Sequence, residues 1–279
     1  MSNAAATPEP VFEIRPSRGW VPLHLGELWT YRELLYFLTW RDVKVRYKQT
    51  ALGAAWAVLQ PFLLMVVFSI FFGRLLNVPS EGVPYPIFAY AALVPWLLFA
   101  NSVAQSGGSL ISNQQLLTKV YFPRLLIPIS ATLGNLVDFV IAFTILIGMM
   151  LYYGIAPSAA LLVTPLLALF AALTALAVGL WLSALNVKYR DIRYIIPFLV
   201  QLWLFATPVA YPSDIVPDAW GLVYHLNPMA GVVEGFRWAL LGTGQLDPMF
   251  GVSVVVSLAL LLGGAVYFRR TERTFADIV

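Results

Sequence analysis

Long apolar runs alternate along the chain with short segments that carry most of its charged residues. A helix needs about 20 apolar residues to cross the hydrocarbon core of a bilayer. Six runs approach that length, so the pattern predicts an all-α integral membrane protein with six spans. The predicted spans are residues 52–76, 85–103, 125–152, 159–185, 194–210 and 250–268.

The positions of the basic residues predict the orientation. If the N-terminus lies inside, every Lys and Arg except Arg74 and Arg237 falls on the cytoplasmic side. Membrane proteins concentrate Lys and Arg on that side, whereas their acidic residues show no such bias. We therefore expect both termini in the cytoplasm.

The composition agrees with a membrane protein and excludes several classes of function. Hydrophobic residues make up 60% of the chain and charged residues 11%, against about 25% charged in soluble domains. The net charge of +3 comes from basic residues at span ends, so no nucleic-acid partner is expected. The chain has no Cys and two distant His, which argues against disulfides, thiolate chemistry and a metal site.

The first 26 residues lack the apolar region of a signal peptide, and we expect a disordered cytoplasmic lead-in. Residues 27–50 predict an N-terminal helix to about Trp40 and then a basic linker. This helix is too polar to span, and lies either in the membrane interface or against the spans of its own protein. The linker carries Arg41, Lys44, Arg46 and Lys48. A transmembrane domain at 51–268 and a short cytoplasmic tail at 269–279 follow.

A polar and amphipathic island, NQQLLTKVYFPR, separates the second and third spans at residues 113–124. Its apolar positions suit one or two helical turns, which Pro123 ends. A short helix between two spans is a natural contact for a cytoplasmic partner, with an apolar centre and a polar rim. The alternative is a solvated loop. The contact residues would be Gln114, Gln115, Leu116, Leu117, Lys119 and Tyr121.

Small and polar residues inside the spans predict helix contacts. Small residues recur every four positions in the fourth span, at Ala171, Ala175, Gly179 and Ser183, and predict close packing against a neighbour. A carboxylate inside the membrane is costly. Asp138 in the third span therefore has either a role in a pore or in function, or a hydrogen bond to a neighbouring helix.

Aromatic side chains share a helix face with a single amide in the first span and again in the fifth. Such a face suits a path for a sugar or a lipid, because rings stack on apolar sugar faces while amides bond hydroxyl groups. The alternative is ordinary core packing. With the carboxylate of the third span, the candidate channel residues are Trp56, Gln60, Phe71, Asp138, Phe198, Gln201 and Phe205.

The segment between the fifth and sixth spans predicts two short outer helices at about 213–242. Asn227 and Pro228 signal the start of the second helix, and Gly242 signals its end. That helix is about 20 Å long, too short to cross a bilayer. We therefore expect a re-entrant pair that dips into the outer leaflet. Its notable residues are Trp220, Tyr224, Glu234, Arg237 and Trp238.

Common catalytic signatures are absent. The chain contains no G-x-x-x-x-G-K-[ST], no H-E-x-x-H and no G-x-S-x-G. It therefore cannot hold ATP in a P-loop, and we expect a channel or permease rather than an enzyme.

Four motifs occur in the order KVRYKQTALGAAWAVLQP, LLTKVYFPRL, LNVKYRDIR and LNPMAGVVEGFRW. In this order the chain, from about Glu27 onward, resembles the membrane subunits of ABC-2 type exporters, specifically the O-antigen and polysaccharide-export permeases. The resemblance implies a homodimer bound to a separate cytoplasmic ATPase dimer, which would hold ATP and Mg, so this chain would carry no cofactor. It also implies that residues 113–123 form the coupling helix on the ATPase, and that the outer helices form a gate.

The expected function is export of a lipid-linked polysaccharide, such as O-antigen, capsule or teichoic acid, across the bacterial inner membrane. Two alternatives stay open: export of a drug or small lipid, and a channel or scaffold without an ATPase. The gene next to this one in the genome distinguishes the three functions. Glycosyltransferase genes beside an ATPase favour the first, resistance genes the second, and the lack of an ATPase the third.

Overall fold

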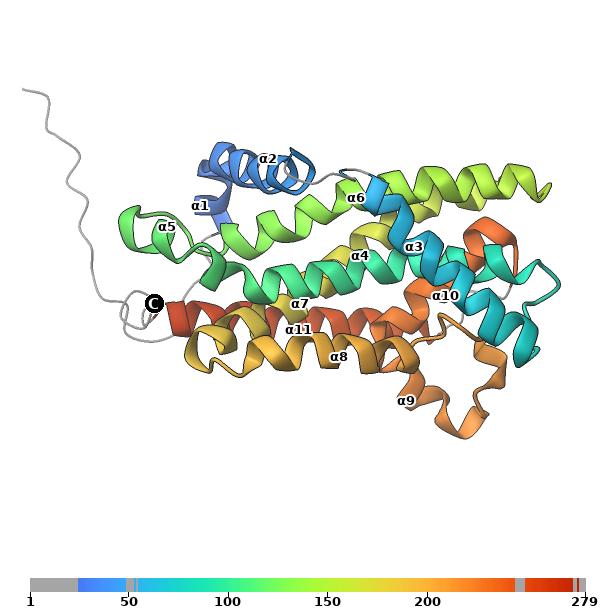
Figure 1. Ribbon diagram of the computed structural model, residues 1–279. Helices are drawn as coiled ribbons and strands as arrows, with labels where there is room; N and C mark the ends of the chain where they lie inside the picture. The colour runs from blue at the N-terminus through green and yellow to red at the C-terminus, as the bar shows by residue number, and fades with distance from the viewer. Residues whose placement is uncertain (1–24, 49–52, 54, 244–248, 273–274, 276–279) are drawn as a thin grey trace, which may run out of the picture.

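The computed structural model describes residues 25–48, 53, 55–243, 249–272 and 275. All regular elements in this part of the chain are helices, which confirms the all-α prediction. Most helices run along a common axis and form an elongated bundle (Figure 1). Five helical segments of the described chain are long and apolar enough to cross a membrane. They are α3 with the π-helix η1 (Ala55–Phe68 and Ser69–Leu75), α4 (Tyr85–Ser112), α6 (Leu126–Tyr152), η2 with α7 (Ala159–Val163 and Thr164–Lys188) and α11 (Phe250–Glu272).

The fifth predicted span is shorter than expected. It contains α8 (Ile192–Ala206), whose 15 residues extend for about 22 Å against a hydrocarbon core of about 30 Å. The helix ends because Pro208 disfavours the helical conformation at the residue before it, and Thr207 is indeed extended, with φ −104° and ψ 140°. The predicted boundary at Ala210 is therefore wrong.

The centre of the bundle is α4, which is buried along most of its length. It packs against α6 and α7, and small residues allow a close approach to α7. A methyl group at Gly179 of α7 would lie 1.9 Å from the Ser106 hydroxyl oxygen of α4. Ala171, Ala175 and Ser183 of the same stripe are fully buried. The predicted packing role of the stripe is confirmed.

One end of the bundle, called the α10 end below, holds the two outer helices. The elements there are η3 (Ser213–Ile215), η4 (Asp218–Trp220), α9 (Gly221–His225) and α10 (Pro228–Leu241). The predicted caps of α10 are confirmed: Asn227 Oδ1 accepts the backbone N–H of Met229 at 3.1 Å, and Gly242 is left-handed with φ 67°. Because α4, α7 and α11 surround α10, it is a packed element rather than a projecting loop.

The opposite end, called the α5 end, holds the remaining short helices. They are α1 (Leu25–Thr30), α2 (Arg32–Lys48) and α5 (Gln114–Lys119). α2 lies beside the first half of α6 (Figure 1). It buries Leu38 and Val43 and leaves Trp40 partly exposed. The basic residues expected in a linker continue this helix, so the predicted helix end at Trp40 is wrong.

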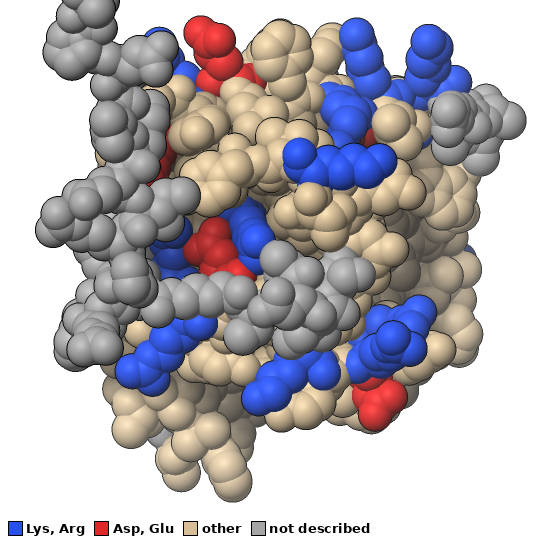
Figure 2. Space-filling view, turned by 90° about the vertical axis from the view of Figure 1, so that its left-hand side faces the viewer, with Lys and Arg blue, Asp and Glu red and all other residues tan. Residues whose placement is uncertain are grey.

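Lys and Arg side chains gather on the face of the α5 end (Figure 2). Arg269 of α11 lies 3.6 Å from Glu27 of α1, which brings both described ends of the chain to this face. The expected placement of both termini in the cytoplasm stays a prediction. The predicted lead-in at residues 1–26 lies almost entirely outside the described residues.

Candidate functional site

A polar network joins α2 to the middle of α6. Asp138 forms an ion pair with Arg46 and accepts a hydrogen bond from the Tyr47 hydroxyl. Arg46 also donates to Asn135 at 3.0 Å and to Gln105 of α4. Burial and the neighbouring Asp138 carboxylate raise the pKa of Tyr47. Arg46 and Tyr47 thus offset the cost of burying the Asp138 carboxylate inside a predicted span.

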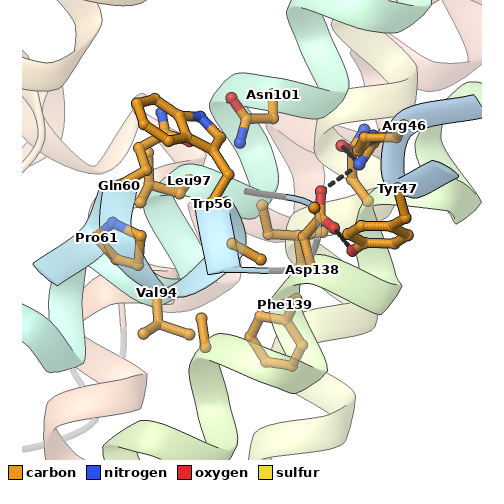
Figure 3. A pocket seen from close by; sticks show the side chains of 15 residues that line it. Arg46, Tyr47, Trp56, Gln60, Pro61, Val94, Leu97, Asn101, Asp138 and Phe139 are labelled. Carbon is orange, nitrogen blue, oxygen red and sulfur yellow. Dashed lines mark hydrogen bonds and ion pairs between the residues drawn. The ribbon is translucent and has the colours of Figure 1, made fainter. Parts of the chain in front are cut away.

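A cavity of about 470 Å³ lies next to this network, between α3, α4 and α6. Figure 3 shows Trp56, Gln60 and Asn101 on one side of it, and Asp138 with its two partners on the other. The apolar part of its wall consists of Ala57, Pro61, Val94, Leu97, Leu98, Phe139 and Ala142. Its size is within the range of about 300–1,000 Å³ typical of small-molecule sites. The wall is mostly apolar, and its amides and paired carboxylate provide a few points at which hydroxyl groups of a ligand can bond.

The cavity brings together three of the predicted channel residues and separates them from the rest. Trp56, Gln60 and Asp138 line it, whereas Phe71 lies in η1 and does not. The other three residues, Phe198, Gln201 and Phe205, lie on the exposed face of α8. The opposite face of α8 packs on α4, because Ile196 fits against Gly107, where a methyl group would lie 2.8 Å from Ile196. Within one chain the two aromatic faces therefore do not meet.

The sequence analysis did not predict four polar residues of the cavity wall: Arg46, Tyr47, Asn101 and Asn135. The two asparagines lie inside predicted spans or beside their ends, and that signal could have identified them. Arg46 and Tyr47 had no such signal, because the basic segment was expected to be a linker.

The predicted coupling segment is a short helix, α5, whose apolar side faces the chain itself. Leu117 is only 5% exposed and packs with Phe122 and Leu126, and Leu116 is partly buried against the same cluster. Leu117 therefore faces the core of its own chain and Leu116 stays partly accessible, so the docking role of this segment remains a prediction. The outer surface instead consists of Gln114, Gln115, Thr118, Lys119, Val120 and Tyr121, of which Tyr121 is 90% exposed.

A direct contact links the coupling segment to α2. Arg41 donates a hydrogen bond of 2.7 Å to Asn113, the residue that precedes α5. The same helix carries Arg46 and Tyr47 to the cavity, less than two turns further along. α2 therefore touches both the coupling segment and the cavity wall.

At the α10 end, one of the predicted gate residues, Arg237, is buried among polar and aromatic groups. Arg237 donates to the backbone oxygens of Val209 at 2.9 Å and Tyr211 at 3.2 Å, and lies 3.6 Å from the centre of the Phe88 ring. Glu81 and Glu234 interact electrostatically with it. Tyr224, Glu234 and Trp238 are partly buried, and Trp220 is exposed. This cluster holds the outer helices against α4.

Comparison with known proteins identifies the family. The family model for ABC-2 type transporters matches residues 33–241, about three quarters of the chain. The chain belongs to the ABC-2 type transporter family. The match extends from α2 to the end of α10, and so includes the cavity and the coupling segment.

Relatives of this ABC-2 chain cover nearly its whole length. The O-antigen export system permease protein RfbA of Myxococcus xanthus is 32% identical over 260 residues, which are 91% of this chain and 98% of the relative. A protein of the same name from Klebsiella pneumoniae is 28% identical over 88% of this chain and 95% of the relative. The polysialic acid transport protein KpsM of Escherichia coli is 23% identical over 83% of this chain and 91% of the relative. The ABC-2 chain is similar to both kinds of transport protein.

Proposed function

We propose that this ABC-2 chain is the permease subunit of an ATP-driven exporter that moves a lipid-linked polysaccharide across the bacterial inner membrane. The names of its relatives support this substrate class. The observation that carries the proposal is the cavity, in which Trp56 faces the amides of Gln60 and Asn101 next to a paired carboxylate. These groups can stack on a sugar ring and bond its hydroxyl groups.

The transport path is completed by a second copy of the chain. Phe71 of η1 and Phe198 and Phe205 of α8 are more than half exposed in a single chain. Exposed rings on membrane helices suit contact with lipid, with another helix or with a channel wall, and a second copy of the chain supplies the last two. A homodimer would bring the aromatic faces of α3 and α8 together around one path, with the outer helices as its gate.

Energy for transport comes from a separate ATPase dimer, which holds ATP and Mg. The α5 end faces the cytoplasm in this arrangement, because its basic side chains belong on that side. The exposed surface of α5, from Gln114 to Tyr121, docks on the ATPase. It is polar apart from Val120 and the Tyr121 ring, which give it a small apolar part within a polar rim.

The proposed path is tested by replacing Trp56 and Gln60 with Ala and measuring surface polysaccharide at equal membrane levels of the chain. Each lost contact is worth about 1–1.5 kcal/mol, so the double variant should lower export at least tenfold. Phe62→Ala is the matched control, since Phe62 is an exposed aromatic residue of α3 outside the cavity. Export unchanged in the double variant would refute the path.

A second candidate function is export of a drug or a small lipid, favoured by the apolar part of the cavity wall. A deletion strain distinguishes the two. Loss of surface polysaccharide with unchanged drug sensitivity supports the first function, and the reverse result supports the second. A chain that purifies without any ATPase would instead indicate a channel or scaffold.

A further inference from the structure

The corner between α5 and α6 is bound to the far end of the sequence. The backbone N–H of Arg124 donates to the Glu272 carboxylate at 3.1 Å, and its guanidinium donates to the Glu272 backbone oxygen. The guanidinium also lies 5.9 Å from the centre of the Phe275 ring. Glu272 is the last residue of α11, so this helix ends directly on the coupling corner.

Neighbouring groups make this attachment firm. Arg269 donates to Glu272 at 3.1 Å and also reaches Glu27 of α1. Phe268 and Phe275 are fully buried and make an edge-to-face contact, with ring centres 5.4 Å apart. Both rings belong to the same apolar cluster as Leu117 of α5. A displacement of α5 therefore acts on the end of α11 through polar and apolar contacts together.

The start of α11 touches the outer helices. Ser253 donates to the backbone oxygen of His225 in α9 at 3.0 Å and is fully buried. A methyl group at Gly231 of α10 would lie 2.6 Å from the Phe250 ring, so helix and ring are in close contact there. α11 is thus attached at one end to the coupling corner and at the other to α9 and α10.

Between its ends α11 is fixed to α7. Ser257 shares a hydrogen bond of 2.9 Å with Thr174, and Trp181 donates to the Leu260 backbone oxygen at 3.0 Å. Trp181 also stacks on Tyr267, with ring centres 4.9 Å apart. With 23 residues, α11 extends for about 35 Å. An unbroken helix of that length moves as a stiff body.

We propose that α11 transmits the displacement of the coupling segment to the outer helices, and that Glu272 is the positioning residue that attaches it to Arg124. The inference rests on the proposed function, in which an ATPase acts on α5. It adds a route that bypasses α4 and α6, the two spans joined to α5 by the chain itself. Coupling of this kind requires an element whose position depends on both sites. α11 meets this requirement, because it contacts the coupling corner at one end and the outer helices at the other.

The test measures whether ATP at the α5 end changes the exposure of the α10 end. The chain has no Cys, so a single Cys at exposed Trp220 can report labelling by a membrane-impermeant thiol reagent. In the purified complex with its ATPase, we expect ATP to change the labelling rate severalfold. Glu272→Ala should abolish that change and lower export at least tenfold, while ATPase binding and ATP hydrolysis stay within twofold of the parent.

Two further variants separate transmission from simple damage to the fold. Ser253→Ala alters the opposite end of α11 and should give the same uncoupled behaviour, whereas Glu33→Ala, at an exposed acidic residue of α2, should behave like the parent. If Glu272→Ala does not reach the membrane, Glu272→Leu takes its place, because Leu fills similar space but cannot accept the Arg124 N–H. An ATP-dependent labelling change and export at parental levels in these Glu272 and Ser253 variants would overturn the inference. Failure of the proposed function would appear differently, as a parent chain that binds no ATPase.

Discussion

Replacing Arg46 with Ala tests the network that holds α2 against α6. The substitution removes the ion pair with Asp138 and the hydrogen bonds to Asn135 and Gln105. Asp138 then keeps only Tyr47 among these partners and must bear its charge beside an apolar cavity wall. We expect α2 to detach from α6 and the cavity to lose its polar side.

Breaking a buried ion pair by removing one partner costs about 3–5 kcal/mol. Arg46 and Asp138 keep 25% and 20% of their side-chain surface exposed, so the pair is not fully buried and we expect about 2–3 kcal/mol. For a chain of this size the melting temperature should fall by roughly 5–10 °C. Thermal unfolding of the chain in detergent measures this change. Arg32→Ala serves as the control, because Arg32 lies at the exposed start of the same helix.

A double-mutant cycle with Asp138→Ala decides whether the pair itself is responsible. Removing both charges should restore part of the lost stability, because no uncompensated carboxylate remains. We expect a coupling energy of about 1–3 kcal/mol. Strictly additive effects of the two substitutions would refute the reasoning and reduce Asp138 to an ordinary polar residue of the cavity wall.

Three further predictions concern packing, docking and capping. Gly179→Ala should lower stability by about 1–3 kcal/mol in thermal unfolding, whereas Gly148→Ala, with open space around it, should lower it by less than 0.5 kcal/mol or raise it slightly; equal losses would contradict the close approach of α4 and α7. Tyr121→Ala should weaken ATPase co-purification at normal membrane levels, while Leu117→Asp should lower the amount of folded chain itself; the reverse pattern would restore Leu117 as the docking residue. Asn227→Ala should cost about 1–2 kcal/mol, because the side chain caps α10 and accepts from Trp203 at 2.8 Å; unchanged unfolding would show that the cap is dispensable.

The features predicted well from the sequence are those with a local cause. Apolar length located five long helices, because the cost of burying backbone in lipid imposes that length. Asn227 and Gly242 marked the ends of α10, because each satisfies or terminates the helix backbone within a few residues. The small residues around Gly179 indicated packing for the same reason: their size alone permits a close approach.

The features predicted poorly depend on partners that are distant in sequence. Leu117 was expected to face a partner protein, yet it packs on residues of α6 and α11 that periodicity cannot identify. Arg46 was expected in a linker, because nothing near it in sequence indicates that Asp138, 92 residues away, is its partner. The end of α8 was different, since Pro208 is a local signal that hydropathy outweighed.

The bond between Arg124 and Glu272 also has a consequence for the order of synthesis. The two residues are separated by 148 positions, which a ribosome adds in roughly 7–30 seconds. During that interval the spans α4 and α6 can already have entered the membrane, but the corner between α5 and α6 lacks the helix that braces it. In the proposed orientation, a nascent chain therefore presents an unbraced corner on the ATPase side until α11 has been made. A cell that recruits the ATPase through a firmly held α5 would assemble the transporter only after translation of the permease has passed Glu272.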